Sequence, residues 1–359
     1  MPLLARVSTR PFELALRGAL RWGAAGELGR LEHVLVSVFN DAEHVGTAEA
    51  PVRPTIYGET VAGIEAVIRT QLAPALVGLE VTDRAAQLEA LARLPNNACA
   101  RGALDTALCD LRAKATGRTL FEAERGNRER LQVSFILGLG PLQTMLAEAA
   151  RVYEQGVRVF KVKVGRSAAH DEEVLGALGH LFSGAGVSVY ADANESIDPE
   201  TAAKDLARLA KLGVMYVEEP LPVQLLRARA ALKRAEILPL IADDSCFTLA
   251  ELGRELDFDT FDILNIKTAR TGFSISQKML ELAQNAGKGV MVGSQASAGL
   301  GTLHAAIFSS KAGVTHPCEL SFPLKLESDI LSGSFTFEDG FLALENLKTL
   351  YLSPEVAPT

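Results

Sequence analysis

Phe160–Gly165 reads FKVKVG, and it is the first of five apolar runs that end in charged or polar residues. The other four are Tyr190–Ser196 (YADANES), Tyr216–Pro222 (YVEEPLP), Ile241–Ser245 (IADDS) and Asn265–Gly272 (NIKTARTG). Counted onward from Lys163, successive steps of 29, 26, 25 and 24 residues reach Asp192, Glu218, Asp243 and Lys267. Each step is about as long as one strand plus one helix, so a charged residue recurs at the end of successive strands.

Seven apolar runs alternate with stretches that are each long enough for one helix. They are Gln132–Leu137, Arg158–Val164, Val187–Ala191, Val214–Val217, Leu238–Ala242, Phe261–Ile266 and Val290–Val292. A weaker eighth run lies near Gly313–Leu320. This alternation indicates βαβ units and a parallel sheet, and seven or eight consecutive units predict a closed α/β barrel of the TIM type. No GxGxxG element follows the early strands, which argues against a dinucleotide-binding fold.

The first 130 residues have a different pattern, which predicts a small α+β domain. Leu31–Asn40 is rich in β-branched residues and predicts a strand, whereas Gly46–Gly58 contains two prolines and predicts a loop. Thr60–Leu79 has helical periodicity, and Asn96–Thr116 predicts a helix that Asn caps and Gly117 ends.

Composition excludes several classes of protein. The chain has 359 residues, of which 48% are hydrophobic and 22% charged, as in an ordinary globular protein. A formal net charge of −8 without a basic stripe argues against nucleic-acid binding. No run of about 18 apolar residues predicts a membrane span, and the N-terminus does not resemble a signal peptide. We therefore expect a cytoplasmic protein whose four cysteines are buried free thiols.

Charged groups at the carboxyl ends of barrel strands predict a metal site. Asp192, Glu218 and Asp243 would converge at one end of the barrel, where such enzymes keep their active sites. Three converging carboxylates repel one another unless a cation lies between them, and oxygen ligands with room for water favour Mg²⁺ over Ca²⁺. The alternative interpretation is a set of ion pairs between these carboxylates and the lysines.

Two lysines in this set have the positions of acid/base catalysts. Lys161 and Lys163 point to one face of their strand, and a neighbouring cation together with burial should lower a lysine pKa. Lys267 comes from a strand across the barrel mouth, so Lys163 and Lys267 could face opposite sides of one substrate carbon. The predicted chemistry is removal of the proton next to a carboxylate, with Mg²⁺ stabilising the enediolate.

These motifs resemble those of the enolase superfamily, and within it the muconate-lactonizing-enzyme subgroup (mandelate racemase/muconate cycloisomerase). AEAPVRPTIYGET resembles a loop that covers substrate, and ARGALDTALCDLRAKATGRTL resembles the long helix of the N-terminal domain. The resemblance implies a modified (β/α)₇β barrel over residues 131–320 and an α+β capping domain over 1–130. Residues 321–359 would return to the capping domain.

The resemblance also implies roles for individual residues. Asp192, Glu218 and Asp243 match metal ligands, Lys163 and Lys267 match the acid/base pair, and Lys161 matches a residue near the substrate carboxylate. Around them, three residues would support the ligands and bases: Asn194, Glu219 and Asp244. Capping loops near Arg21-Trp22-Gly23 and Glu49–Tyr57 would close over substrate. The remaining substrate-binding candidates are Trp22, Tyr57, Gln295, Ser297 and Glu319.

Several reactions share this machinery. The resemblance implies an isomerase, either a cycloisomerase or a racemase/epimerase, acting on a small carboxylate. Alternatives are o-succinylbenzoate synthase, which would make the chain a lyase, and N-acylamino-acid racemase or dipeptide epimerase. Dipeptide epimerases tend to carry Asp-x-Asp after the eighth strand, where this chain has Glu319-Leu320-Ser321. A metal-binding barrel without catalysis is the alternative of another class, and relatives are often homo-oligomers.

Overall fold

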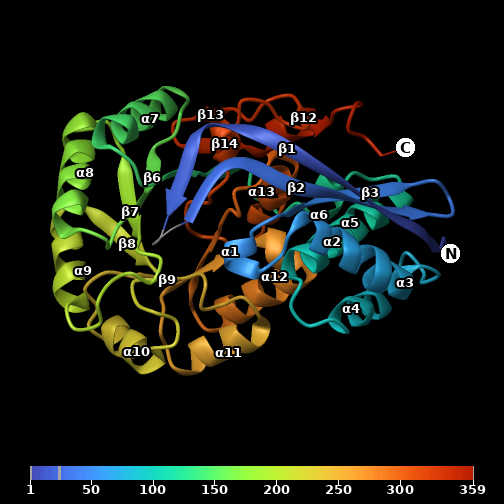
Figure 1. Cartoon of the computed structure of the whole chain (residues 1–359), viewed down its shortest axis with the longest axis horizontal. Coiled ribbons are helices and arrows are strands. Elements are labelled where there is room, and N and C mark those ends of the chain that lie inside the picture. The colour runs from blue at the N-terminus through green and yellow to red at the C-terminus, as the bar shows by residue number, and fades with distance from the viewer. Residues whose placement is uncertain (1, 23–25, 359) are drawn as a thin grey trace.

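A parallel seven-stranded sheet curls into the centre of one half of the molecule, as the computed structural model shows for residues 2–22 and 26–358 (Figure 1). Its strands lie in chain order, each beside the next. They are β5 (Ser134–Leu137), β6 (Val159–Lys163), β7 (Ser188–Asp192), β8 (Val214–Glu218), β9 (Leu240–Ala242), β10 (Ile263–Ile266) and β11 (Gly289–Val292). All seven predicted strands are therefore confirmed, and so is the α/β barrel class.

The predicted eighth run is an extended segment and not a regular strand. The Thr315 and Glu319 N–H groups donate to Val290 and Val292 of β11. On the other side, the Cys318 N–H donates to the Gln132 carbonyl, and the Ser134 N–H of β5 donates to the Cys318 carbonyl. The segment thus connects the two edge strands, so the backbone groups of both edges find partners.

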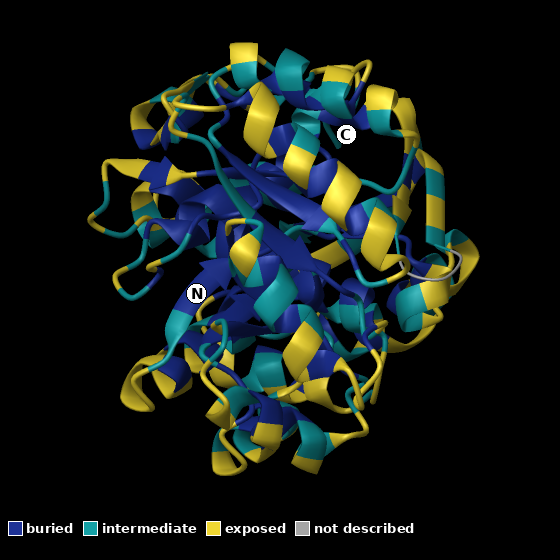
Figure 2. Ribbon diagram, turned by 90° about the vertical axis from the view of Figure 1, so that its left-hand side faces the viewer, coloured by how far each residue is buried: buried dark blue, intermediate teal, exposed yellow. Residues whose placement is uncertain are grey.

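Helices cover the outside of the curled sheet. They are α7 (Leu142–Glu154), α8 (Ala168–Leu181), α9 (Ala202–Lys211), α10 (Leu226–Arg234), α11 (Leu249–Asp257), α12 (Thr268–Asn285) and α13 (Gly299–Ser309). Figure 2 shows that the strands are buried and that the helices turn exposed residues outward. This is the expected pattern for amphipathic helices that bury one stripe against a parallel sheet.

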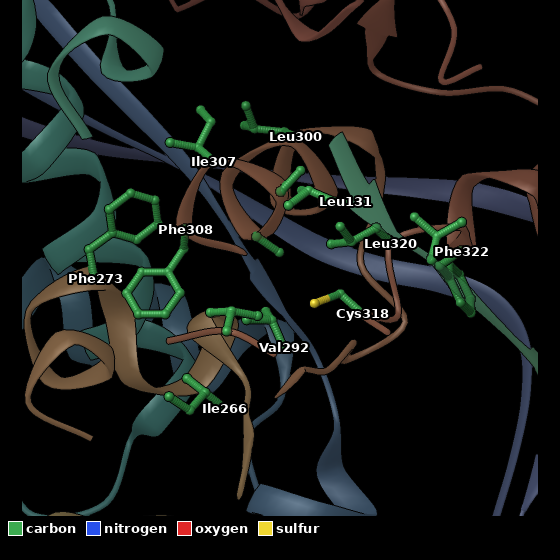
Figure 3. Close-up of a cluster of buried hydrophobic side chains, with 14 of the residues drawn as sticks. Leu131, Ile266, Phe273, Val292, Leu300, Ile307, Phe308, Cys318, Leu320 and Phe322 are labelled. Carbon is green, nitrogen blue, oxygen red and sulfur yellow. The ribbon is translucent and has the colours of Figure 1, made fainter. Parts of the chain in front are cut away.

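The apolar core continues from the barrel strands into the helices behind them. Phe273 of α12 and Phe308 of α13 pack with ring centroids 5.7 Å apart, and Ile266 and Val292 lie below them (Figure 3). Each of these four side chains is at most 2% exposed. This packing ties α12 and α13 to the strands that precede them, β10 and β11.

The N-terminal region forms a three-stranded antiparallel sheet with helices beside it (Figure 1). Its strands are β1 (Leu4–Trp22), β2 (Gly26–Asn40) and β3 (Val45–Pro51). The predicted loop over Gly46–Gly58 is therefore wrong, since it contains β3 and the short helix α1 (Pro54–Tyr57). Residues 45–51 pair along β2 and are mostly buried, and this tertiary pairing outweighs the proline signal.

Helices of the same region differ from prediction mainly in their ends. They are α2 (Val61–Val67), a π-helical turn (Ile68–Leu72), α3 (Ala73–Leu76), α4 (Arg84–Ala92), α5 (Ala98–Ala115) and α6 (Leu120–Glu124). The predicted Asn cap of α5 is wrong, because the Asn97 side chain makes no capping bond. The Glu59 carboxylate instead accepts from the N–H groups of Cys99 and Ala100.

Close packing of α5 against α12 joins the N-terminal domain to the barrel. A Cβ on Gly102 would lie 2.8 Å from the Ala269 carbonyl oxygen, and one on Gly272 would lie 2.4 Å from an Asp105 oxygen. Gly272 also has φ of +65°, which favours glycine. The Asp105 carboxylate accepts from the Ser274 N–H at 2.7 Å and from its hydroxyl at 2.6 Å. These contacts hold the first turns of α12, next to Lys267.

The C-terminal segment, described as far as residue 358, contains four short strands: β12 (Leu331–Ser332), β13 (Phe337–Glu338), β14 (Phe341–Ala343) and β15 (Tyr351–Leu352). β14 pairs with β4 (Arg130–Gln132) beside the barrel, while β12 pairs with β15. The Arg17 Nε of β1 donates to the Leu326 carbonyl at 2.8 Å, so this segment also contacts the N-terminal sheet. The domain bounds at residues 130 and 320 remain a prediction.

The four cysteines are buried and free, as predicted. Over the described part of the chain, no helix is long and apolar enough to cross a membrane.

Replacing Phe308 by Ala should lower the free energy of unfolding by about 3–5 kcal/mol, because a fully buried ring leaves a cavity. Phe258→Ala is the matched control, since that ring is 45% exposed and its loss should cost less than about 0.5 kcal/mol. Urea unfolding of both variants measures the difference. Equal losses would contradict the described core.

Candidate active site

A cavity of about 390 Å³ opens at the carboxyl ends of the barrel strands, under the β1–β2 hairpin and α1. The strand ends supply most of its charged lining: Lys161, Lys163, Asp192, Glu195, Asp243, Asp244, Lys267 and Glu319. The N-terminal domain supplies its other wall: Leu20, Trp22, Arg53, Thr55 and Ile56. Residues far apart in the chain therefore meet at one site, as the spacing of the strand ends predicts.

Lys161 is the centre of the buried charges. Its Nζ lies 2.9 Å from Asp192 Oδ2, 2.8 Å from Glu218 Oε1 and 2.7 Å from Glu319 Oε1. Burial lowers the pKa of Lys161, but the three carboxylates outweigh this effect and raise it well above its usual value. Lys161 is therefore a fixed positive charge at the floor of the cavity.

Lys163 and Lys267 enter the cavity from opposite sides. β6, which ends at Lys163, is separated in the sheet from β10, which precedes Lys267, by β7, β8 and β9. The Lys163 Nζ donates to Asp192 Oδ2 at 2.5 Å and to Asn194 Oδ1 at 2.8 Å. The Lys267 Nζ donates to Asp243 Oδ2. Each amine is thus held by its own carboxylate while both line one space.

The expected lowering of a lysine pKa rested on the neighbouring Lys161 and Lys163, and the other predicted base, Lys267, does not show it in this arrangement. Burial does lower the pKa of Lys267, but the carboxylates of Asp243 and Asp244 outweigh it, and the net shift is upward. For the carboxyl groups that accept from these lysines, the positive charges outweigh burial, and the pKa is lowered. Burial alone would raise the pKa of Asp192, yet Lys161 and Lys163 bring it down to about 2. Spacing along one strand reveals a neighbouring lysine, but it does not reveal how closely carboxylates from other strands approach.

Asp192, Glu218 and Asp243 lie on consecutive strands, but in this structure they contact ammonium groups. Within residues 2–22 and 26–358, no three acidic, His or Cys side chains form a cluster of the kind that holds a metal ion. Two carboxylate oxygens in the set are nevertheless buried without a hydrogen bond, Glu218 Oε2 and Asp243 Oδ1. The Arg270 Nη2 lies 3.3 Å from the latter. An oxygen-only donor set with two unsatisfied buried oxygens fits a hard divalent cation.

Three residues predicted to support the ligands contact the strand ends. Asn194 accepts from Lys163 through its side chain, and its N–H donates to Asp192 Oδ1 at 3.0 Å. Glu219 accepts from the Asp243 N–H at 2.8 Å and the Ser245 hydroxyl at 2.6 Å, so it orients the loop that carries Asp243. Asp244 lines the cavity and pairs with Arg270 at 3.7 Å.

Glu319 is buried and its carboxylate is fully engaged. Oε1 accepts from Lys161 Nζ and, at 3.2 Å, from the Tyr190 hydroxyl. Oε2 accepts from the Ser294 N–H at 2.7 Å. The residue predicted as a substrate contact therefore also balances Lys161 and connects the eighth segment to the loop after β11.

The other predicted substrate contacts divide into two groups. Trp22 and Gln295 line the cavity, and the Gln295 Nε2 is buried without a hydrogen-bond partner. Tyr57 and Ser297 are not among the lining residues. Tyr57 turns its ring against Phe247, at 5.5 Å between centroids, while Ser297 is buried and its N–H donates to the Ser294 hydroxyl at 3.3 Å. Gly23 of the predicted capping loop lies outside the described residues.

Arg53 and Phe247 also line the cavity, although the sequence singled out neither: Arg53 lies within the predicted capping loop Glu49–Tyr57, and Phe247 lies outside every predicted segment. The Arg53 Nη2 donates to the carbonyls of Gln295 at 2.6 Å and Ala296 at 2.9 Å, so it fastens the loop after β11 to the N-terminal domain. No spacing rule marks an arginine whose partners are carbonyls 242 and 243 residues away. Only its place in a Pro-rich segment distinguishes it.

Two family models match most of the chain. Residues 144–348 match the model described as "Enolase C-terminal domain-like". Residues 23–122 match the model described as "Mandelate racemase / muconate lactonizing enzyme, N-terminal domain". The chain belongs to the mandelate racemase/muconate lactonizing enzyme subgroup of the enolase superfamily. The predicted resemblance is confirmed.

Relatives in this subgroup are named for different isomerisations. An N-succinylamino acid racemase of Thermus thermophilus is 30% identical over 86% of this chain and 84% of its own. An L-Ala-D/L-Glu epimerase of Bacillus subtilis is 29% identical, over 94% and 90%. A solved structure of the "muconate lactonizing enzyme from Mucobacterium Smegmatis complexed with muconolactone" is 33% identical, covers 98% of both chains and has a TM-score of 0.92. The chain is therefore an isomerase of the mandelate racemase/muconate lactonizing subgroup.

Replacing Lys161 by Met should lower the free energy of unfolding by about 3–5 kcal/mol at neutral pH, because three buried carboxylates lose their shared counter-ion. The control is Lys233→Met, which removes a pair to the half-exposed Asp259 and should cost at most about 1 kcal/mol. Urea unfolding in the presence of a chelator measures both. A loss below that of the control would contradict the role of Lys161 as the central charge.

Proposed function

We propose that this isomerase is Mg²⁺-dependent and moves the proton on the carbon next to a substrate carboxylate. The observation that carries the proposal is the opposition of Lys163 and Lys267 across one cavity. Two amines on opposite sides of a carbon are what a two-base proton transfer requires. A barrel that only bound a metal ion would not need two opposed amines.

Asp192, Glu218 and Asp243 would hold the cation. Supporting this assignment are their positions on three consecutive strands and the unsatisfied oxygens of Glu218 and Asp243. Enzymes of this superfamily pair a lysine or histidine base with Mg²⁺. When bound, Mg²⁺ would supply positive charge that offsets the charge developing on the substrate carboxylate.

The three lysines of the site have different roles in the proton transfer. One of Lys163 and Lys267, as the neutral amine, removes the α-proton, and the other, as an ammonium ion, returns a proton to the opposite face. Lys161 stays cationic and faces the carboxylate oxygens of the enediolate, where charge accumulates. Asn194 and Asp192 fix the Lys163 amine, so it needs little reorganisation to reach the substrate.

The far end of the cavity supports a substrate without a free ammonium group. The acid after the eighth segment, Glu319, already has three donors and is not available to bind a fourth. Gln295 instead offers a buried, unpaired N–H donor, which suits a carbonyl or carboxylate oxygen. Trp22 and Ile56 add an apolar cover. Racemisation of an N-acylated amino acid is the reaction that this cavity supports best.

Cycloisomerisation of an unsaturated dicarboxylate is the second candidate. It is favoured by 33% identity over nearly the whole chain to a muconate lactonizing enzyme, together with the eighth-segment residues Glu319-Leu320-Ser321. Dehydration of the o-succinylbenzoate synthase type uses the same enediolate. Gln295 would donate to the distal oxygen of the substrate in each case. Racemisation and dehydration would form the enediolate by removing the α-proton, whereas lactonisation would form it by adding a carboxylate oxygen to a double bond, after which one lysine would protonate the α-carbon.

Proton exchange in D₂O tests the shared step. With Mg²⁺ present, at least one of a panel of N-acylamino acids, dipeptides and muconate should exchange its α-proton or cyclise, as followed by NMR and mass spectrometry. Lys163→Ala and Lys267→Ala should each abolish exchange from one enantiomer by at least about 10²-fold while the other enantiomer still exchanges. Arg254→Ala, on the outer surface of α11, is the activity control.

Two outcomes would overturn the proposal. Unchanged exchange in both lysine variants would remove the two-base assignment. Absence of exchange with every member of the panel, in protein that still binds Mg²⁺, would favour the barrel without catalysis.

Direct titration of Mg²⁺ tests the metal assignment without reference to turnover. Asp243→Asn and Glu218→Gln should each weaken Mg²⁺ binding by at least about 10-fold in isothermal titration calorimetry, because each removes one anionic ligand. Asp205→Asn, on the outside of α9, should leave the affinity unchanged. Equal affinity in all three variants would exclude these ligands.

A further inference from the structure

A second cavity, larger than the first at about 730 Å³, lies between the N-terminal domain and the barrel. Its walls come from α4 and α5 on one side and from α11 and the first turns of α12 on the other. Ile56 and Phe247 line both cavities. The second cavity is thus separated from the candidate active site by a single layer of side chains.

Acidic groups in the second cavity already have partners. Asp105 accepts from the N–H and the hydroxyl of Ser274, and Glu251 accepts from the N–H and the hydroxyl of Thr248. Glu89 pairs with Arg93 at 3.3 Å. Glu59 lies near Arg101 but does not line the cavity, and its carboxylate accepts from the N–H groups of Cys99 and Ala100 at the start of α5. The carboxylates around this space are therefore engaged.

Several hydrogen-bond donors that line the same cavity have no acceptor. Arg270 is only 4% exposed, and its Nε and Nη1 make no hydrogen bond, although Asp244 lies 3.7 Å from Nη1. The Tyr57 hydroxyl is buried beside Arg270 and has no hydrogen-bond partner other than that guanidinium, so its own O–H remains available to an acceptor. Nearer the opening, Arg101 Nε is buried and unpaired, and Lys278 has no ion pair within the described residues. Unpaired buried donors are costly, so such a set favours a ligand that brings acceptors.

The rest of the lining is apolar. Leu88 and Leu91 of α4 face Leu249 of α11 and Ile275 of α12. Such a wall suits a hydrocarbon body, because burying it removes apolar surface from water on both sides. The cavity therefore combines an apolar wall with free donors, of which three belong to cationic side chains.

We propose that this cavity is a second binding site, separate from the active site, for a small organic carboxylate with an apolar body. Its carboxylate would accept from Arg270, Tyr57 and Arg101, and its hydrocarbon part would lie against Leu88, Leu249 and Ile275. Arg270 also donates to the Asp243 carbonyl at 2.9 Å, so the occupant would touch a residue that contacts the active site. The proposal does not depend on which reaction the active site performs.

Binding of octanoate to the full chain tests the site, with octan-1-ol as the uncharged comparison. Saturation-transfer NMR titration should give at least about 10-fold weaker binding for the alcohol, because it cannot offer a charged acceptor to the arginines. Arg101→Gln should weaken octanoate binding by at least about 5-fold. Arg93→Gln, a neighbouring arginine that does not line the cavity, should not.

Variants that fill one cavity or the other distinguish octanoate binding in the second cavity from octanoate binding in the active site. Ile275→Trp should abolish octanoate binding, whereas Leu282→Trp, two turns further along α12 and 40% exposed, should retain it. Val223→Trp, which fills only the first cavity, should also retain it. Circular dichroism of each variant checks folding. Binding that survives Ile275→Trp, or that is lost only in Val223→Trp, would overturn the proposal.

Discussion

The buried ammonium group of Lys161 is the interaction on which the site depends. Acidic side chains from β7, β8 and the eighth segment meet at one barrel end, where burial makes each of them costly to keep charged. A single Nζ within 2.9 Å of Asp192, Glu218 and Glu319 offsets that cost and sets the distances among the strand ends. The same clustering of carboxylates is what the proposed divalent cation would use as its ligands.

Closure of this site depends on contacts between the two parts of the chain. Glycines at 102 and 272 allow α5 to pack closely on α12, and Asp105 orders the first turns of α12 beside Lys267. On the other side, Arg53 fastens the loop after β11 through two carbonyl groups. The N-terminal domain therefore holds the segment that carries Lys267 and the loop that carries Gln295 while it covers the cavity. The same docking leaves the second cavity between α4 and α11.

Local patterns were sufficient for most of the fold and for the charged part of the site. The seven strands followed from apolar runs at regular spacing, and the charged residues followed from their place at the strand ends. The prediction failed where long-range pairing outweighed local signals. Prolines at 51 and 54 predicted a loop, yet residues 45–51 form an edge strand of a sheet because β2 supplies a partner for their backbone. The cap of α5 was likewise assigned to Asn, although Glu59 supplies it.

The sequence by itself determined the barrel, the identity of the charged residues and the chemistry that they can perform, because strand period and ligand type are local properties. Only the tertiary structure decided how those charges balance. Lys267 has a raised pKa because the carboxylates of Asp243 and Asp244 outweigh both burial and the charge of Arg270, and Glu319 is saturated because Lys161, Tyr190 and Ser294 converge on it. Distances between residues on different strands set the Coulomb energies, and spacing along the chain does not contain them. The tertiary structure also decided that Gln295 faces the substrate cavity, whereas Tyr57 faces the second one.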